Sequence, residues 1–211
     1  GKTWLRGLKL SSGKFHNLPT IAGGVLVFLA ALSLYLATLA PTLSWGRDQM
    51  GVDGGDLLAA VATLGIPHPT GYPTYVITLK LFATVVPLGD LAFRGNLFSA
   101  LLSAGTAVLI YMIILRFSHL ILPSSTTLLK VSSGLIGAIT FAATPLFWSQ
   151  AIITEVYALN AFFSALLVLL ACLLHGTTRE KAGSLLDSNQ ILLMLFAFVA
   201  GISAGNHLTI L

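Results

Sequence analysis

The chain has 211 residues, of which 56% are hydrophobic and 9% charged, and its mean hydropathy is +0.92. This composition excludes a soluble globular protein and predicts an all-α protein that crosses a membrane several times. The net charge of +4 comes largely from basic residues ahead of the first apolar run, which orient membrane helices and give no reason to expect nucleic-acid binding: Lys2, Arg6, Lys9 and Lys14.

Five apolar runs are long enough to cross the hydrocarbon core, which takes about 17 to 25 residues. In chain order they are residues 21–39, 97–115, 131–147, 157–174 and 191–211. We therefore predict a helical bundle of about five spanning helices. Residues 1–20 form its cytoplasmic basic N-terminus and residues 21–211 its transmembrane domain. Because the last apolar run reaches the end of the sequence, we expect the protein to continue beyond it.

A sixth apolar stretch, residues 72–86, has only 15 residues and contains Lys80. We predict that it lies along the membrane interface or re-enters the membrane without crossing. All basic residues except Arg47, Lys80 and Arg94 are then cytoplasmic, whereas this bias largely disappears if the stretch does cross. The non-crossing arrangement makes residues 41–96 the first external loop.

The same arrangement collects acidic groups and imidazoles on the external face. These residues are Asp48, Asp53, Asp56, Asp90, Glu155, His68 and His207. A site at the outer membrane surface needs such groups together, although the orientation rule also accounts for part of their distribution.

Residues 52–73 carry the densest chemical signal. Apolar residues recur at helical spacing from Leu57 onward, which predicts a short helix that begins near Gly55 with Asp53 and Asp56 on its polar side. Free backbone N–H groups at a helix start stabilise anions, so we expect Asp53 to be ionised and able to act as a base. The simpler alternative is that both carboxylates only cap the helix.

Three prolines and a glycine then fall within residues 67–73 and predict a rigid turn that holds His68 and Tyr72. His68 either contacts a ligand or only bonds to the turn backbone. Glu155 lies just before the fourth apolar run, where an acid is costly unless it is paired or hydrated. Asn206 and His207 lie near the outer end of the fifth run, where hydrogen bonds between helices are the alternative to a binding role.

The order of four motifs resembles the N-terminal half of a bacterial membrane family related to protein O-mannosyltransferases, within the GT-C glycosyltransferases. The motifs are Asp-Gly-Gly-Asp-Leu, Leu-Gly-Ile-Pro-His-Pro-Thr-Gly-Tyr-Pro, Trp-Ser-Gln followed by Thr-Glu-Val-Tyr-Ala-Leu-Asn, and Gly-Asn-His-Leu-Thr. The resemblance covers roughly residues 32–211, and residues 53–75 are its most distinctive part.

The resemblance implies a GT-C-like bundle in the bacterial inner membrane with an external active site. It implies an inverting transfer of a mannose-like sugar from a polyprenyl-phosphate donor to a hydroxyl of a secreted or membrane protein. The catalytic base is then Asp53, while Asp56 stands where the family commonly has Glu. Glu155 takes the place of the acid in the second external loop.

Candidates for binding the substrates are His68, Tyr72, Lys80, Arg94, Asn206 and His207. The cations among them could balance the charge that develops on the leaving lipid phosphate. This scheme requires no cofactor, and we assign no metal ligands, although the three catalytic carboxylates could accept Mg²⁺ or Mn²⁺. The alternative function is a non-catalytic GT-C-like scaffold subunit of a membrane complex. A transporter is disfavoured, because none of the seven acids falls in the middle of an apolar run.

Overall fold

The computed structural model describes residues 17–44, 53–175 and 188–210, and the regular elements in these residues are all helices. They are α1 (Leu18–Ala37), α2 (Gly54–Thr63), α3 (Pro73–Val85), α4 (Leu91–Ile121), α5 (Thr127–Ala142), α6 (Pro145–Ala151), α7 (Tyr157–His175), α8 (Ser188–Ala204) and the short 3-10 helix η2 (Leu208–Ile210). The predicted all-α fold class is confirmed. Arg47, Asp48 and most of the basic N-terminus lie outside the described residues.

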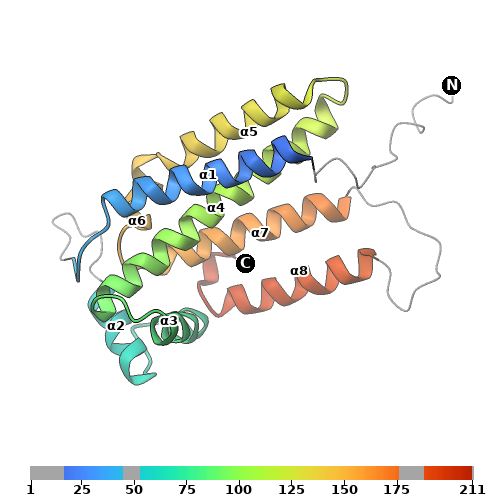
Figure 1. Ribbon diagram of the computed structural model, residues 1–211. Coiled ribbons are helices and arrows are strands. Elements are labelled where there is room, and N and C mark those ends of the chain that lie inside the picture. Colours follow the sequence, from blue (N-terminus) through green and yellow to red (C-terminus); the bar gives the residue numbers. More distant parts are fainter. Residues whose placement is uncertain (1–16, 45–52, 176–187, 211) are drawn as a thin grey trace.

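The long helix α4 is the centre of the bundle and packs against α1, α5 and α7, while α8 packs against α7. Small side chains permit this close packing, since Ala100, Ala104 and Ala107 of α4 are fully buried. Gly134 of α5 faces the ring of Tyr111, where a Cβ atom would come within 2.7 Å of Cδ2. Figure 1 shows the five bundle helices side by side, with α2 and α3 gathered at the end where α1 stops and α4 starts.

Among the residues that the structure describes, fewer helices can span a membrane than the predicted five or so. Three helices, α1, α4 and α7, are long and apolar enough to cross a membrane, and α5 with α6 makes a fourth only if this pair, bent by 69°, counts as one span. The bend follows from Pro145, which cannot continue α5 and instead begins α6. Helix α8 ends at Ala204 after 17 residues, about 25 Å, short of the roughly 30 Å hydrocarbon core.

Helix α3 corresponds to the sixth apolar stretch. Its 13 residues measure about 20 Å, which is too short to span the core. Figure 1 shows α3 across the end of the bundle instead of along it. Thr74 fixes its first turn to the end of α8, because the Thr74 backbone N–H donates to the Gly205 carbonyl (3.0 Å) and its hydroxyl donates to the Ile202 carbonyl (2.7 Å).

Candidate active site

Asp53 lies at the N-cap position of α2, but its carboxylate makes no capping hydrogen bond and the side chain is 47% exposed. Its backbone carbonyl instead accepts from the Leu57 N–H at 2.9 Å and starts the helix. Gly54 lets this helix start approach the loop between α6 and α7, because a Cβ there would lie 3.3 Å from the Thr154 carbonyl oxygen. The Asp53 carboxylate is therefore available for chemistry and is not used as a helix cap.

Asp56 holds the imidazole of His68 in place. One carboxylate oxygen, Oδ2, accepts from the His68 backbone N–H and contacts its ring Nδ1, both at 2.8 Å. The backbone hydrogen bond, followed by the ring hydrogen bond, lowers the pKa of Asp56. The other ring nitrogen, Nε2, lies 3.7 Å from Oδ2 of Asp53 and 3.2 Å from the Tyr72 hydroxyl. The His68 imidazole thus lies beside two predicted carboxylates, Asp53 and Asp56, and the predicted Tyr72.

Tyr72 joins this group to the end of α8. It occupies the N-cap of α3 in a left-handed conformation (φ 41°), and its side chain is buried. Its ring stacks on that of His207, with centroids 5.9 Å apart. The ring of Tyr157 also packs on His207, at a centroid distance of 5.8 Å. Thr209 contacts Nδ1 of His207 at 2.8 Å. The first turns of α3 and α7 and the end of α8 therefore share one polar and aromatic wall.

Glu155 is the buried acid of the site, with 4% of its surface exposed. Its loop is anchored by the residue before it, since the Thr154 hydroxyl donates to Oδ1 of Asn96 at 2.8 Å. Asn96 in turn donates to the Ala40 carbonyl (2.8 Å) at the end of α1. Burial, followed by the negative charge of Asp53, raises the pKa of Glu155 to about 7. Glu155 is thus placed to change its charge near neutral pH.

Three of the predicted binding residues point to backbone carbonyls instead. Lys80 donates to the Ala62 carbonyl (2.8 Å) in the last turn of α2. Arg94 donates to three carbonyls around the α3–α4 connection, at 3.0 to 3.2 Å. Asn206 is buried and donates to the Val156 carbonyl at 3.3 Å. Among the described residues, no group of three or more His, Cys, Asp or Glu side chains is arranged to hold a metal ion.

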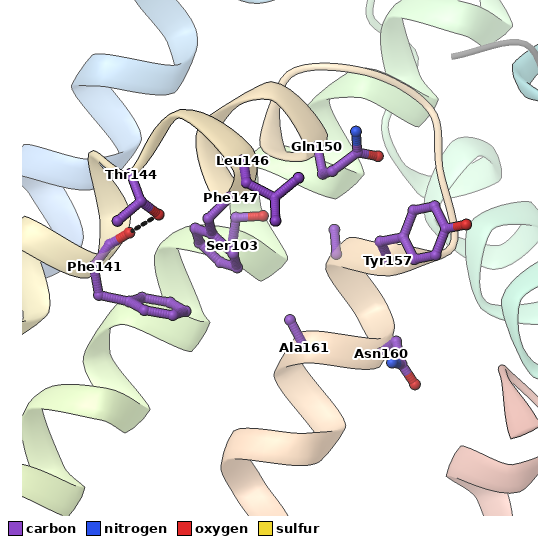
Figure 2. Close-up of a pocket in the computed structure, with 10 residues that line it drawn as sticks. Ser103, Phe141, Thr144, Leu146, Phe147, Gln150, Tyr157, Asn160 and Ala161 are labelled. Carbon is purple, nitrogen blue, oxygen red and sulfur yellow. Dashed lines mark hydrogen bonds between the residues drawn. The ribbon is translucent and has the colours of Figure 1, made fainter. Parts of the chain in front are cut away.

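A cavity of about 600 Å³ adjoins the site between α4, the α5–α6 bend and α7. Figure 2 shows Tyr157, Ala161 and Asn160 on its α7 side and Phe141 and Phe147 opposite. Its wall is mostly apolar and includes the buried Ser103. Tyr157 also packs on His207, so the first residue of α7 links the cavity to the aromatic part of the site.

Comparison with known proteins identifies the family. The sequence pattern of the family described as "Protein O-mannosyl-transferase TMEM260 N-terminal domain" matches residues 53–211. The chain belongs to this family. The match begins at Asp53 and includes every residue of the site described above. This confirms the predicted relation to protein O-mannosyltransferases, while the bacterial origin stays a prediction.

Two curated relatives carry a related name. The mouse protein O-mannosyl-transferase TMEM260 is 30% identical over 190 residues, which cover 90% of this chain and 24% of the relative. The Dictyostelium discoideum protein O-mannosyl-transferase tmem260 is 28% identical over 162 residues, which cover 74% of this chain and 18% of the relative. The chain thus spans about a quarter or less of the length of these relatives. No solved structure matches the chain.

Within this TMEM260 N-terminal domain, sequence reasoning missed the residues that support the site. Tyr157 is one of them, because its ring packs on His207. Asn96 and Thr154 are two others, because the hydrogen bond between them fixes the loop of Glu155. The one signal for Asn96 was an amide at the edge of a spanning run, where an unbonded polar group is costly.

Proposed function

We propose that the protein is a membrane glycosyltransferase that moves a mannose-like sugar from a polyprenyl-phosphate donor to a protein hydroxyl on the external side of the membrane. The observation that carries this proposal is the Asp53 carboxylate, which makes no helix-capping hydrogen bond and is half exposed. It lies beside His68 and Glu155 at one end of an apolar helical bundle. Membership of the TMEM260 N-terminal domain family, whose described activity is protein O-mannosyl transfer, supports the reaction class.

In the proposed reaction the acceptor hydroxyl attacks C1 of the sugar as its proton passes to the Asp53 carboxylate. The bond between C1 and the phosphate oxygen breaks, and the lipid phosphate leaves from the opposite face, so the configuration at C1 inverts. The transition state resembles an oxocarbenium ion, as in glycoside hydrolysis. A positioned general base accelerates such a step by about 10²- to 10⁴-fold.

The neighbouring groups have distinct proposed roles. Glu155, with its pKa raised to about 7, is in part protonated at neutral pH and can then donate a hydrogen bond to a sugar or acceptor oxygen. The apolar helices accommodate the chain of the donor, and the cavity lined by Tyr157 offers apolar volume at the start of α7. The scheme needs no cofactor.

The test is sugar transfer by membranes that contain the protein. They are incubated with radiolabelled polyprenyl-phosphate mannose and an unfolded secreted polypeptide. We expect label on the polypeptide that dilute alkali releases, as expected of a sugar on serine or threonine. If neither mannose nor any other lipid-linked sugar is transferred, the proposal is wrong and the alternative, a scaffold subunit of a membrane complex, takes its place. The proteins that co-purify would then identify the complex.

A further inference from the structure

The imidazole of His68 lies between two carboxylates that belong to one helix turn. We propose that His68 takes the proton from Asp53 after each transfer, and that Asp56 is the positioning residue that holds His68 for this task. This inference rests on the proposed function. It gives Asp56 a role different from that of Asp53, although both are carboxylates on the same face of α2.

The hydrogen bonds fix the state of the ring. An ionised carboxylate only accepts hydrogen bonds, so the contact of 2.8 Å between Asp56 and Nδ1 places the proton of the neutral ring on Nδ1. The lone pair of Nε2 then faces Oδ2 of Asp53 at 3.7 Å and accepts from the Tyr72 hydroxyl at 3.2 Å. Asp56 also accepts from the backbone N–H of His68, which fixes the carboxylate beside the ring.

The proton balance of the reaction gives such an acceptor a role. Each transfer forms one C–O bond, breaks one C–O bond to phosphate and releases the proton of the acceptor hydroxyl. Asp53 receives this proton and must lose it before it can act again. Nε2 of His68 accepts it, and the resulting imidazolium lies between two carboxylates, which stabilise its charge. The His68 side chain is 36% exposed, so the proton passes from the ring to water.

Once formed after the transfer, the imidazolium also supplies a positive charge at a site where the departed lipid phosphate has gained negative charge. Among the described residues, Lys80 and Arg94 donate to backbone carbonyls and make no ion pair with the site's carboxylates. The titratable groups around His68 are Asp53 and Asp56 from α2, Tyr72 from the start of α3, Glu155 from the α6–α7 loop, and His207 behind Tyr72. The positive charge of a protonated His68 favours the ionised form of Glu155.

The experiment measures transfer of labelled mannose by the full-length protein and its variants between pH 5.5 and 9. His68→Ala should lower kcat by about 10²-fold, the scale of a proton-transfer group, with KM for the donor within about threefold. Added imidazole should restore at least a tenth of the lost rate, and the rescue should follow the concentration of the neutral base. His175→Ala, at the far end of α7, is the matched control and should show neither the loss nor the rescue.

Asp56→Asn provides a second variant. It removes a negative charge that stabilises the imidazolium, so the acid limb of the pH–rate profile should move to lower pH while kcat falls by about 10- to 100-fold. A purely structural role for His68 predicts no rescue by imidazole and no movement of this limb. The inference is overturned by that result, or by His68→Ala with a kcat within threefold of wild type. If wild-type protein transfers nothing, the proposed function itself has failed.

Discussion

Replacement of Glu155 by Gln is expected to stabilise the protein at alkaline pH. Glu155 is 4% exposed and lies beside the charge of Asp53, so its ionised form is disfavoured in the folded state. Gln keeps the shape of the side chain but carries no charge at any pH. The variant therefore removes the cost of ionisation while it preserves the packing of the loop between α6 and α7.

The magnitude follows from the pKa. Each factor of ten in proton binding corresponds to about 1.4 kcal/mol, so a pKa raised from 4.5 to about 7 corresponds to about 3 kcal/mol. Because the folded state binds this proton more tightly than the unfolded state, wild-type stability falls as pH rises from about 4.5 to about 7. The loss is complete above pH 7. Glu155→Gln and wild type should thus be equally stable near pH 4.5, and the variant more stable above pH 7.

Thermal unfolding of detergent-solubilised protein at pH 5 and pH 8 measures this difference. For a chain of this size, about 3 kcal/mol corresponds to a rise in Tm of about 6 to 12 °C at pH 8, with little change at pH 5. Asp90→Asn is the control. In the wild type, the hydrogen bond that Asp90 accepts from Thr42 lowers the pKa of Asp90. Asp90→Asn should therefore be slightly less stable than wild type at high pH. Equal Tm values for Glu155→Gln and wild type at pH 8 would refute the reasoning.

Three further variants test the supporting structure in thermal unfolding, and a fourth tests transfer. Gly95→Ala should destabilise the protein by about 1 to 3 kcal/mol in thermal unfolding, because the new Cβ would overlap the Thr154 hydroxyl. A Cβ at Gly201 would meet no atom within 4 Å, so Gly201→Ala should be neutral or stabilising by up to about 1 kcal/mol. Asn96→Ala should cost about 1 to 3 kcal/mol in the same assay, because it leaves buried hydrogen-bonding groups without a partner. Lys80→Gln should keep the transfer rate within about twofold of wild type, since its ammonium group bonds to a helix end.

The sequence was sufficient to predict α2 and the turn that follows it because their constraints are local. The helical spacing after Leu57 predicted α2 within one residue of its observed start at Gly54. The dense prolines around His68 predicted a turn, and that turn places the imidazole over α2. The motif order then predicted the family, which the match over residues 53–211 confirmed.

Side-chain directions and helix ends were beyond the sequence because they depend on tertiary packing. Lys80 bonds to the Ala62 carbonyl at the end of α2, a contact that its place in the sequence does not indicate. The number of spans was overestimated because hydropathy ignores the break at Pro145 and the early end of α8 at Ala204. The partnership of Tyr157 with His207 joins two elements far apart in the chain, and no local pattern predicts it.

The most direct test of the central claim compares Asp53→Asn with Asp90→Asn in the mannose-transfer assay at matched protein levels. Both variants remove one carboxylate from the same end of the bundle, and Asn preserves the N-cap hydrogen bond that Asp90 makes to the Phe93 N–H. We predict that Asp53→Asn lowers kcat by about 10²- to 10⁴-fold while Asp90→Asn transfers label at nearly the wild-type rate. Unchanged transfer by Asp53→Asn would remove this carboxylate from catalysis and contradict the account.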